Sequence, residues 1–457
     1  MPQPRSIDEP ARNVPVSSEV DVLVVGGGPS GIIAALAASQ EGARVALIEK
    51  RGFVGGNLTI GLPILGFLSQ RGEQIIKGLP QRFIDRLREI DAAGPHQPCP
   101  LHVSITLIEP DAVNPSAFAM LTEAGVEITL DAFCAGVIMD GACLRGVIIE
   151  TKSGRHAMLT KVAIDCTGDA DVAFRAGARC EKGDEHGRMQ PATLMFRMSG
   201  VDTEKLRSSL AVNPDTYDVD YISPDYFAHN RRFVVVGLRN LIAKVRADGL
   251  SIPTDRTILI TALRDGDVWV NMTRVKGVDG TDPRSLTSGT IAAAGQIEHI
   301  RRYLVSYVPG FGNASVSAVA PFLGIRETRR IVGQYVLTRE DILGCGRFDD
   351  AVAVGSYPID LHRPGDYGCT LEWCGDCYEI PYRALVPQGV DNLLVAGRCI
   401  STTHEAMAAI RVMSTCMAMG EAAGRAAAMA ACKSITPFAI DVSALRDRLR
   451  ARGAFVR

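Results

Sequence analysis

The residues that most clearly carry chemistry are glycines near the amino end of the chain. They stand within residues 21–48. This stretch begins with a β-branched run, continues as an alanine-rich segment and ends in an apolar run, and it predicts a strand, a tight turn, a helix and a second strand. In such a unit Gly26 permits the sharp turn, Gly28 lets a pyrophosphate approach the backbone, and Gly31 lets the helix pack on the strand. The turn reads Gly26-Gly-Gly28-Pro29-Ser30-Gly31.

Glu49 closes the second predicted strand. A carboxylate at this position accepts hydrogen bonds from an adenosine ribose and repels the extra phosphate of NADP. The turn and Glu49 together predict a dinucleotide site. An ordinary glycine turn is the alternative that the pattern alone leaves open.

Three further segments distinguish FAD from NAD. They are similar to the flavin-contacting segments of flavoproteins of the glutathione-reductase type, and they occur in the same order. The segments are Glu49-Lys50-Arg51-Gly-Phe-Val-Gly55-Gly56-Asn57-Leu-Thr59, Asp165-Cys-Thr167-Gly168-Asp169 and Leu394-Val-Ala-Gly397-Arg398-Cys-Ile-Ser401. The resemblance implies FAD contacts at these glycines and at Lys50, Arg51, Asn57, Thr59, Ala135, Thr167, Asp169 and Arg398.

A narrower resemblance rests on four other segments. The chain resembles a broad bacterial family of FAD-dependent oxidoreductases over roughly residues 20–430. This resemblance implies an FAD-dependent oxidoreductase and names no substrate. The segments are 275–279, Leu323-Gly-Ile-Arg326-Glu-Thr-Arg-Arg330, Thr403-His404-Glu-Ala406 and Arg411-Val-Met413.

The helix predicted from Glu405 to Cys432 should direct free N–H groups at its amino end toward the flavin pyrimidine edge, where negative charge accumulates on reduction. Arg398 adds positive charge there, or forms a surface ion pair. His404 would stand next to the ring, so it is a candidate base, as is His362 beside Asp360. Either histidine can instead be merely packed or solvated.

Arg326 is the candidate anchor for a substrate carboxylate, and an Arg–Glu network that joins two domains is the alternative. Cys374 and Cys377 stand at CxxC spacing, which suits a redox dithiol, although structural thiols are favoured and no metal site is expected. The stretch from Gly55 to Gly66 contains no cysteine, which disfavours flavin-linked disulfide reduction by the glutathione-reductase route. No second glycine fingerprint follows a strand between Gln190 and Asp391, so an NADPH-binding unit is not expected.

These observations predict hydride removal from a small organic substrate, as in a dehydrogenase or oxidase. Electrons would then leave to oxygen, a quinone or a carrier protein. One alternative is a flavin monooxygenase. The last flavin segment counts against it, because Gly397-Arg398 replaces the Gly-Asp pair of hydroxylases. The other alternative is an electron-relay subunit that uses Cys374 and Cys377.

The expected architecture is α/β. A Rossmann-like FAD-binding domain with a parallel sheet and a β-meander would be built from residues 17–190 and 385–457. An inserted α+β cap with an antiparallel sheet would span 191–384. Turn dipeptides at Asp140-Gly141 and Ser153-Gly154 predict the meander, and the proline-rich stretch from Ala92 to Pro100 predicts a loop.

Composition narrows the class of protein. Lysine and arginine total 49 against 51 acidic residues, with no long run of one sign, so nucleic acid is not an expected partner. The amino end lacks the pattern of a secretion signal, no apolar run is long enough to span a bilayer, and twelve scattered cysteines match a reducing compartment. We therefore expect a cytoplasmic protein. Substrate, oxidant and subunit number stay open, a homo-oligomer included.

Overall fold

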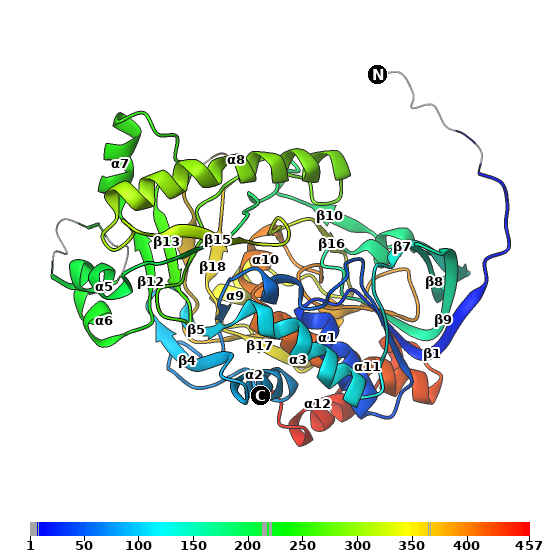
Figure 1. Ribbon diagram of the computed structural model, residues 1–457. Helices are drawn as coiled ribbons and strands as arrows, with labels where there is room; N and C mark the ends of the chain where they lie inside the picture. The colour runs from blue at the N-terminus through cyan, green and yellow to red at the C-terminus, as the bar shows by residue number, and fades with distance from the viewer. Residues whose placement is uncertain (1–6, 8, 213–216, 219–221, 364, 366) are drawn as a thin grey trace.

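The computed structural model describes residues 7, 9–212, 217–218, 222–363, 365 and 367–457. Within them the chain forms a mixed α/β fold with one large, partly parallel sheet and a smaller antiparallel sheet, as Figure 1 shows. The predicted fold class, a parallel sheet with a meander and a second antiparallel sheet, is confirmed.

Apolar β-branched runs build the middle of the large sheet, where Val22, Leu23 and Val24 are fully buried. Such runs suit parallel strands, because helices cover both faces of a parallel sheet. The described part of this sheet has seven strands, in the order β6 (Glu127–Thr129), β2 (Val45–Ile48), β1 (Val16–Val25), β9 (Gly154–Asp165), β8 (Cys143–Thr151) and β7 (Phe133–Asp140), with β21 (Leu393–Val395) also paired to β9.

Strand β9 joins the parallel part of the sheet to the meander. Its first half pairs antiparallel with β8, and its last three residues pair parallel with β21. Along its length it also pairs parallel with β1. Gly141 and Gly154 have φ of 59° and 106° at the two meander turns, which is the conformation that the predicted turn dipeptides supply.

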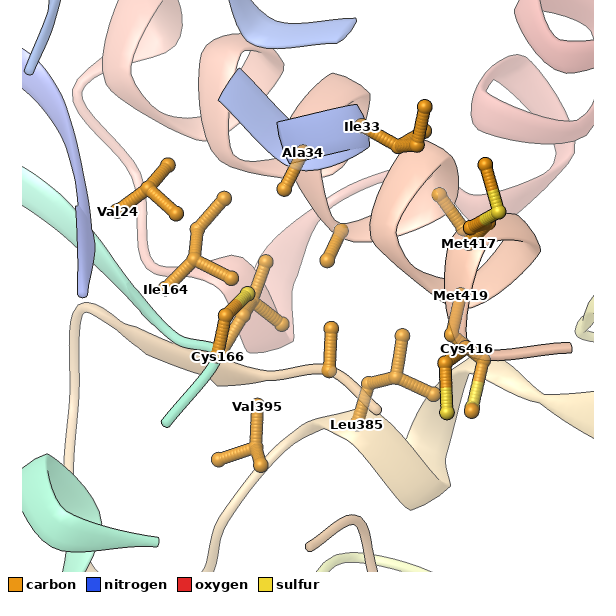
Figure 2. Packing of buried hydrophobic residues seen from close by; sticks show 14 of the residues in the cluster. Val24, Ile33, Ala34, Ile164, Cys166, Leu385, Val395, Cys416, Met417 and Met419 are labelled. Atoms are coloured by element: carbon orange, nitrogen blue, oxygen red, sulfur yellow. The ribbon is translucent and has the colours of Figure 1, made fainter. Parts of the chain in front are cut away.

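Two helices from opposite ends of the chain pack against each other beside this sheet. They are α1 (Pro29–Gln40) and α11 (Met413–Lys433). A Cβ at Gly420 would lie 2.2 Å from the Ser30 carbonyl oxygen, and one at Gly424 would lie 2.2 Å from that of Ala34. Only glycine permits this approach, which holds α11 against α1. Figure 2 shows Ala34 of α1 and Met417 of α11 in the same cluster of buried apolar side chains.

A second cluster of buried apolar side chains lies around the antiparallel sheet. The long helix α8 (Pro283–Tyr307) covers this sheet (Figure 1), and the Tyr303 hydroxyl lies 2.6 Å from the Thr257 hydroxyl. The strand order is β12 (Val234–Gly237), β13 (Thr257–Thr261), β14 (Val268–Val270), β11 (Phe196–Ser199) and β15 (Ser315–Val319).

The remaining described elements are short. Strands β3 (Ile64–Leu65), β5 (Val103–Ile108) and β4 (Ala93–Cys99) form one sheet, and the pairs are β10 (Cys180–Lys182) with β16 (Arg329–Ile331), β17 (Ala351–Gly355) with β20 (Tyr378–Pro381), and β18 (Ile359–Leu361) with β19 (Thr370–Glu372). Helices are α2 (Leu79–Arg88), α3 (Pro110–Glu123), α4 (Asp171–Arg175), α5 (Thr203–Val212), α6 (Pro224–His229), α7 (Arg239–Ala247), α9 (Arg339–Leu343), α10 (His404–Ile410) and α12 (Val442–Ala451), and short 3-10 turns span Gly56–Thr59, Tyr382–Leu385 and Pro437–Ala439.

Two predicted elements are wrong. The stretch from Ala92 to Pro100 is largely strand β4 and not a loop, because an edge strand tolerates prolines, and the register shift between Ala93 and His96 accommodates one of them. The single helix predicted from Glu405 to Cys432 is two helices, α10 and α11, because Val412 has extended backbone angles (φ −66°, ψ 146°) between them.

Buried side chains from 331–384, which the sequence analysis assigns to the cap, pack into the cluster around the large sheet. The cluster around the antiparallel sheet draws mostly on residues 60–107 and 192–323, together with Tyr357 and Val412. The predicted boundary between the cap and the FAD-binding domain at residue 384 therefore stays a prediction. Among the described residues no helix is both long and apolar enough to cross a membrane.

Candidate active site

The predicted cofactor segments meet at one edge of the large sheet. In the register of the parallel strands, Val25 pairs with Ile48 and with Asp165, and Asp165 also pairs with Val395. Because these strands run in the same direction, the segments that follow them emerge side by side. Such an edge is where ligands of open α/β sheets bind.

The turn between β1 and α1 has the conformation that its three glycines were expected to provide. Gly26 has φ of 103°, and a Cβ there would lie 2.5 Å from the Cys166 carbonyl oxygen. A Cβ at Gly31 would lie 1.8 Å from the Gly26 carbonyl oxygen, so any side chain at Gly31 would force strand and helix apart. Gly28 differs, because a Cβ there would have no protein atom within 4 Å.

Glu49 is 6% exposed and lies against this turn. Its Oε2 accepts a hydrogen bond from the Gly27 N–H (2.7 Å), and its Oε1 accepts one from the Arg51 N–H (3.0 Å). Backbone donors therefore hold the carboxylate at the end of β2, in the position where a ribose is expected.

The paired glycines, Gly55 and Gly56, pack on the same turn. The Gly55 N–H donates to the Gly27 carbonyl oxygen (2.7 Å), and a Cβ at Gly56 would lie 3.0 Å from the Gly28 Cα. Both glycines have positive φ, 109° and 49°. Their likeness to flavoprotein sequences therefore has a steric basis in close approach between the two loops.

Asp169 and Arg398 connect the ends of β9 and β21. The Arg398 Nη2 lies 2.5 Å from the Asp169 Oδ1, its Nε donates to the Gly168 carbonyl oxygen (2.7 Å), and a third hydrogen bond from its guanidinium reaches the Ile325 carbonyl oxygen. Lys50 lies 3.8 Å from the other carboxylate oxygen of Asp169. Arg398 is therefore a part-buried side chain that connects three segments, and it is not a surface ion pair.

A cavity of about 550 Å³ lies between these segments. Most of the predicted cofactor residues line it: Gly26, Gly28, Pro29, Ser30, Glu49, Lys50, Arg51, Gly56, Asn57, Thr167, Gly168, Asp169, Gly397 and Arg398. Four predicted residues are not in its lining, namely Gly31, Gly55, Thr59 and Ala135. The cavity lining at the start of β7 is Ala132, Phe133 and Cys134, which precede the predicted Ala135.

The sequence model that describes FAD dependent oxidoreductases matches residues 21–449. The chain belongs to this family. It is an FAD-dependent enzyme, and the match covers every residue that lines the cavity, from Val25 to Cys416.

Other similarities are short or distant. A 51-residue stretch is 49% identical to the dihydrolipoyl dehydrogenase of Trypanosoma brucei brucei, and the match spans 11% of each chain. Among solved structures, a geranylgeranyl bacteriochlorophyll reductase-like protein from Thermoplasma acidophilum is 14% identical, with 95% of this chain and 83% of that one covered and a TM-score of 0.49. A p-nitrophenol 4-monooxygenase from Pseudomonas putida is 13% identical, with 94% and 83% covered and a TM-score of 0.44.

The residues of the large cavity fit FAD. Gly28 leaves open space at the amino end of α1, where a pyrophosphate can approach the backbone, and Glu49 offers a carboxylate to a ribose. When bound, FAD supplies two-electron redox chemistry. The Arg51 guanidinium lies 3.8 Å from the Phe322 ring centroid, and this pair closes the cavity from the side of the second cluster.

The helix that approaches the cavity is not the one that the sequence analysis predicted. Met413 and Cys416, at the amino end of α11, line the cavity, whereas Thr403, His404 and Glu405, at the amino end of α10, line a separate groove. The helix that begins shortly after Ser401 therefore does not direct its amino end at this cavity. The break at Val412 gives α11 that place.

A second cavity, of about 140 Å³, adjoins the first. Both are lined by Asn57, Ile325, Arg398, Arg411 and Met413. The second cavity is otherwise mostly apolar, and its further polar lining includes His102, Arg256, Arg326, Tyr357, Asp360, His362 and Cys369. Two predicted catalytic residues, Arg326 and His362, thus lie together in it.

His404, the other predicted base, lies elsewhere. It is 8% exposed, and its Nδ1 lies 2.8 Å from the Glu327 Oε1. The same carboxylate oxygen lies 2.5 Å from Arg330, which also donates to the Gly183 carbonyl oxygen. This buried group matches the alternative of an Arg–Glu network, and His404 lines neither of the two adjoining cavities.

His362 has a partner on each ring nitrogen. Its Nε2 lies 3.3 Å from the Asp360 Oδ2, and its Nδ1 lies 3.2 Å from Arg274. Burial lowers the pKa of His362 to about 4 although Asp360 opposes this. Burial raises the pKa of Asp360, but His362 and the guanidinium of Arg411 outweigh it and hold that pKa well below its usual range.

Asp360, His362 and Cys369 place three possible metal-ligand atoms within 4.8 Å of one another. The Arg411 Nη2 lies 3.3 Å from the Asp360 Oδ2, the oxygen that His362 also approaches, and Arg256 lies 3.6 Å from the Cys369 Sγ. Two guanidinium groups thus contact the proposed ligands. We interpret the cluster as an ion-paired network, because these positive charges oppose a metal cation.

His102 was not predicted from the sequence. It lies in the turn between β4 and β5 and lines the second cavity. Its Nδ1 lies 3.4 Å from the Cys99 Sγ, and its Nε2 has no hydrogen-bond partner among the described residues. Burial lowers its pKa to about 4. Its ring stacks on that of Tyr357 with centroids 6.2 Å apart. No motif surrounds it, so only the fold reveals it.

Cys374 and Cys377 line neither adjoining cavity. They are 4% and 3% exposed, and neither forms a disulfide in the described structure. Burial raises the pKa of Cys374 to about 12 and that of Cys377 to about 11. Both thiols are therefore protonated at neutral pH, which is unfavourable for dithiol chemistry.

Proposed function

We propose that this FAD-dependent oxidoreductase removes two electrons from a small organic substrate bound in the 140 Å³ cavity, as a dehydrogenase or oxidase does. The observation that carries the proposal is the shared lining of the two cavities at Asn57, Ile325, Arg398, Arg411 and Met413. A substrate in the smaller cavity would contact the redox-active end of the cofactor, in the binding mode of the glutathione-reductase type.

His102 is the proton acceptor that we propose for this reaction. A general base needs a nitrogen that can face the substrate, and the Nε2 of His102 has no partner among the described residues. His362 has both ring nitrogens engaged, so we propose that it positions Asp360 and, through it, Arg411. The role of His404 as a base stays a prediction that its place at Glu327 does not favour.

The test is anaerobic mixing of the purified yellow protein with panels of small metabolites, with loss of the flavin absorbance as the readout. A substrate found in this way should bleach the His102→Asn variant about 100-fold more slowly than wild type, whereas dithionite should bleach both equally. His229→Asn is the matched control, because His229 is exposed and hydrogen-bonded to its own helix.

Three results would contradict the proposal. A colourless protein that does not bind added FAD would refute the cofactor site. Bleaching only by a protein donor would favour an electron-relay subunit, and substrate-dependent oxygen insertion would favour a monooxygenase. Unchanged bleaching of His102→Asn would remove only the assignment of the base.

A further inference from the structure

The charged residues of the smaller cavity do not balance. Three of its arginines have an acidic partner: Arg398 lies 2.5 Å from Asp169, Arg256 lies 3.0 Å from Asp255, and Arg411 lies 3.3 Å from Asp360. Arg326 has no acidic group within 4 Å among the residues that the structure describes. One positive charge is therefore in excess in a largely apolar cavity.

Arg326 also keeps one side of its guanidinium open. Its Nη1 donates to the Pro191 carbonyl oxygen (2.6 Å) and to the Thr193 hydroxyl (2.7 Å). Its Nε and Nη2 have no hydrogen-bond partner in the described part of the chain. These two nitrogens form one edge of the planar group, and that edge binds a carboxylate through two parallel hydrogen bonds.

The surroundings of Arg326 make an unpaired charge costly. Burial, followed by the positive charge of Arg411, lowers the pKa of Arg326 to about 10 although Asp360 opposes this, and the group stays protonated at neutral pH. The buried Nε of Arg411 likewise has no hydrogen-bond partner among the described residues. A buried cation in such a place is usually compensated by an anion.

We propose that the substrate carries a carboxylate, which binds along the Nε and Nη2 edge of Arg326 with the positive charge of Arg411 beside it. This inference rests on the proposed function, because it assigns the substrate class of the same cavity. A single negative charge matches the single excess positive charge. The apolar lining, including Leu65, Met195 and Ile258, would then hold the uncharged part of the substrate.

The experiment uses the FAD-loaded enzyme and pairs of probes that differ only in charge. Propionate is compared with propionamide, and benzoate with benzamide, by isothermal titration calorimetry and by the shift of the flavin absorbance. We expect each carboxylate to bind at least tenfold more tightly than its amide. Arg326→Gln should abolish this preference, and Arg326→Lys should retain part of it, because lysine keeps the charge but not the fork of donors.

Arg145→Gln is the matched control, because Arg145 forms an exposed ion pair on the meander. It should leave the preference for carboxylates unchanged. FAD content and melting temperature show whether each variant is folded, and the lysine variant covers the case in which Arg326→Gln does not fold. Methyl phosphate is a third probe, and tighter binding of methyl phosphate than of propionate would overturn the assignment to a carboxylate.

Failure of the inference is distinguishable from failure of the proposed function. Equal binding of acids and amides, or an unchanged preference in both Arg326 variants, would refute the carboxylate site. A yellow enzyme bleached by neutral metabolites would still support the dehydrogenase. A protein that binds no FAD would instead refute the proposed function itself.

Discussion

Replacement of Gly28 by alanine should weaken FAD binding without weakening the apoprotein. Gly28 caps α1 with φ of −76° and ψ of −170°, angles that alanine adopts without strain. It lines the large cavity, and an added methyl group would meet no protein atom within 4 Å. The methyl group would therefore compete only with whatever the cavity binds.

The expected size of the effect follows from the contacts of a pyrophosphate at a helix amino end. A displaced phosphate loses at least one charge-assisted hydrogen bond, which contributes about 1.5–3 kcal/mol. That corresponds to a Kd for FAD weakened by about 10- to 100-fold. The small loss of capping on going from glycine to alanine is offset by the lower entropy of the unfolded chain, so the apoprotein should melt within about 2 °C of wild type.

The assay is titration of the apoprotein with FAD, followed by flavin fluorescence, together with thermal melting in the absence of FAD. Gly295→Ala is the matched control, because Gly295 is exposed on α8 and an added methyl group there also meets no atom within 4 Å. Gly31→Ala provides the contrast: its methyl group would lie 1.8 Å from a carbonyl oxygen, so it should lower the melting temperature of the apoprotein. Wild-type affinity of Gly28→Ala would refute the placement of the pyrophosphate.

Further predictions concern charge, pH and thiols. Glu49→Gln keeps the size of the side chain but removes its charge, so FAD titration should show about tenfold weaker binding, and an unchanged Kd would remove Glu49 from the ribose site. In the folded protein the pKa of His102 is lowered from 6.5 to about 4, so between these pH values the unfolded chain binds more protons than the folded one. The melting temperature should therefore fall as the pH falls through this range, and it should fall less in the His102→Asn variant. Cys374→Ser and Cys377→Ser should keep wild-type rates of flavin reduction and reoxidation in stopped-flow measurements. Slower reoxidation in either variant would support the alternative of an electron-relay subunit that uses these thiols. The buried Arg425 lies 2.7 Å from Glu41 and 2.7 Å from Glu421, so Arg425→Met leaves two carboxylates without this cation and should lower the free energy of unfolding in urea by about 3–5 kcal/mol. A loss below about 1 kcal/mol would contradict a stabilising role of these ion pairs.

Local sequence predicts the dinucleotide end of the molecule well. The glycine turn, the carboxylate at Glu49 and the paired glycines act through contacts between segments that lie close in the chain or end neighbouring parallel strands. Residue types alone indicate such places, because only glycine permits the required approaches. The strands of the meander are predicted for the same reason, since turn dipeptides mark their ends.

The substrate side is harder to predict, because its residues are brought together only by the fold. His102 lies in a short turn without a motif, and its place beside Tyr357 depends on two separate sheets. His404 is adjacent in sequence to the flavin segment, yet its side chain turns toward Glu327 in a different groove. Proximity in the chain therefore does not show which histidine lines a cavity.

The break between α10 and α11 shows why a continuous helical pattern misleads at this site. The apolar sequence through Ile410 to Met413 suits a helix, but the Arg411 guanidinium donates to the Asp360 carbonyl oxygen (2.9 Å), and Val412 is extended. The interruption creates a second helix amino end at the junction of the two cavities. The close packing of Gly420 on α1 holds that end in place.

The position of this second amino end links the two proposals. A helix amino end carries partial positive charge, and at the junction it lies beside Arg411, which lines both cavities. Arg326 adds a full positive charge on the substrate side. The same field therefore favours both the negative charge that the flavin gains on reduction and the carboxylate that we propose for the substrate. A single uninterrupted helix would have no amino end at that junction, so both proposals depend on the break at Val412.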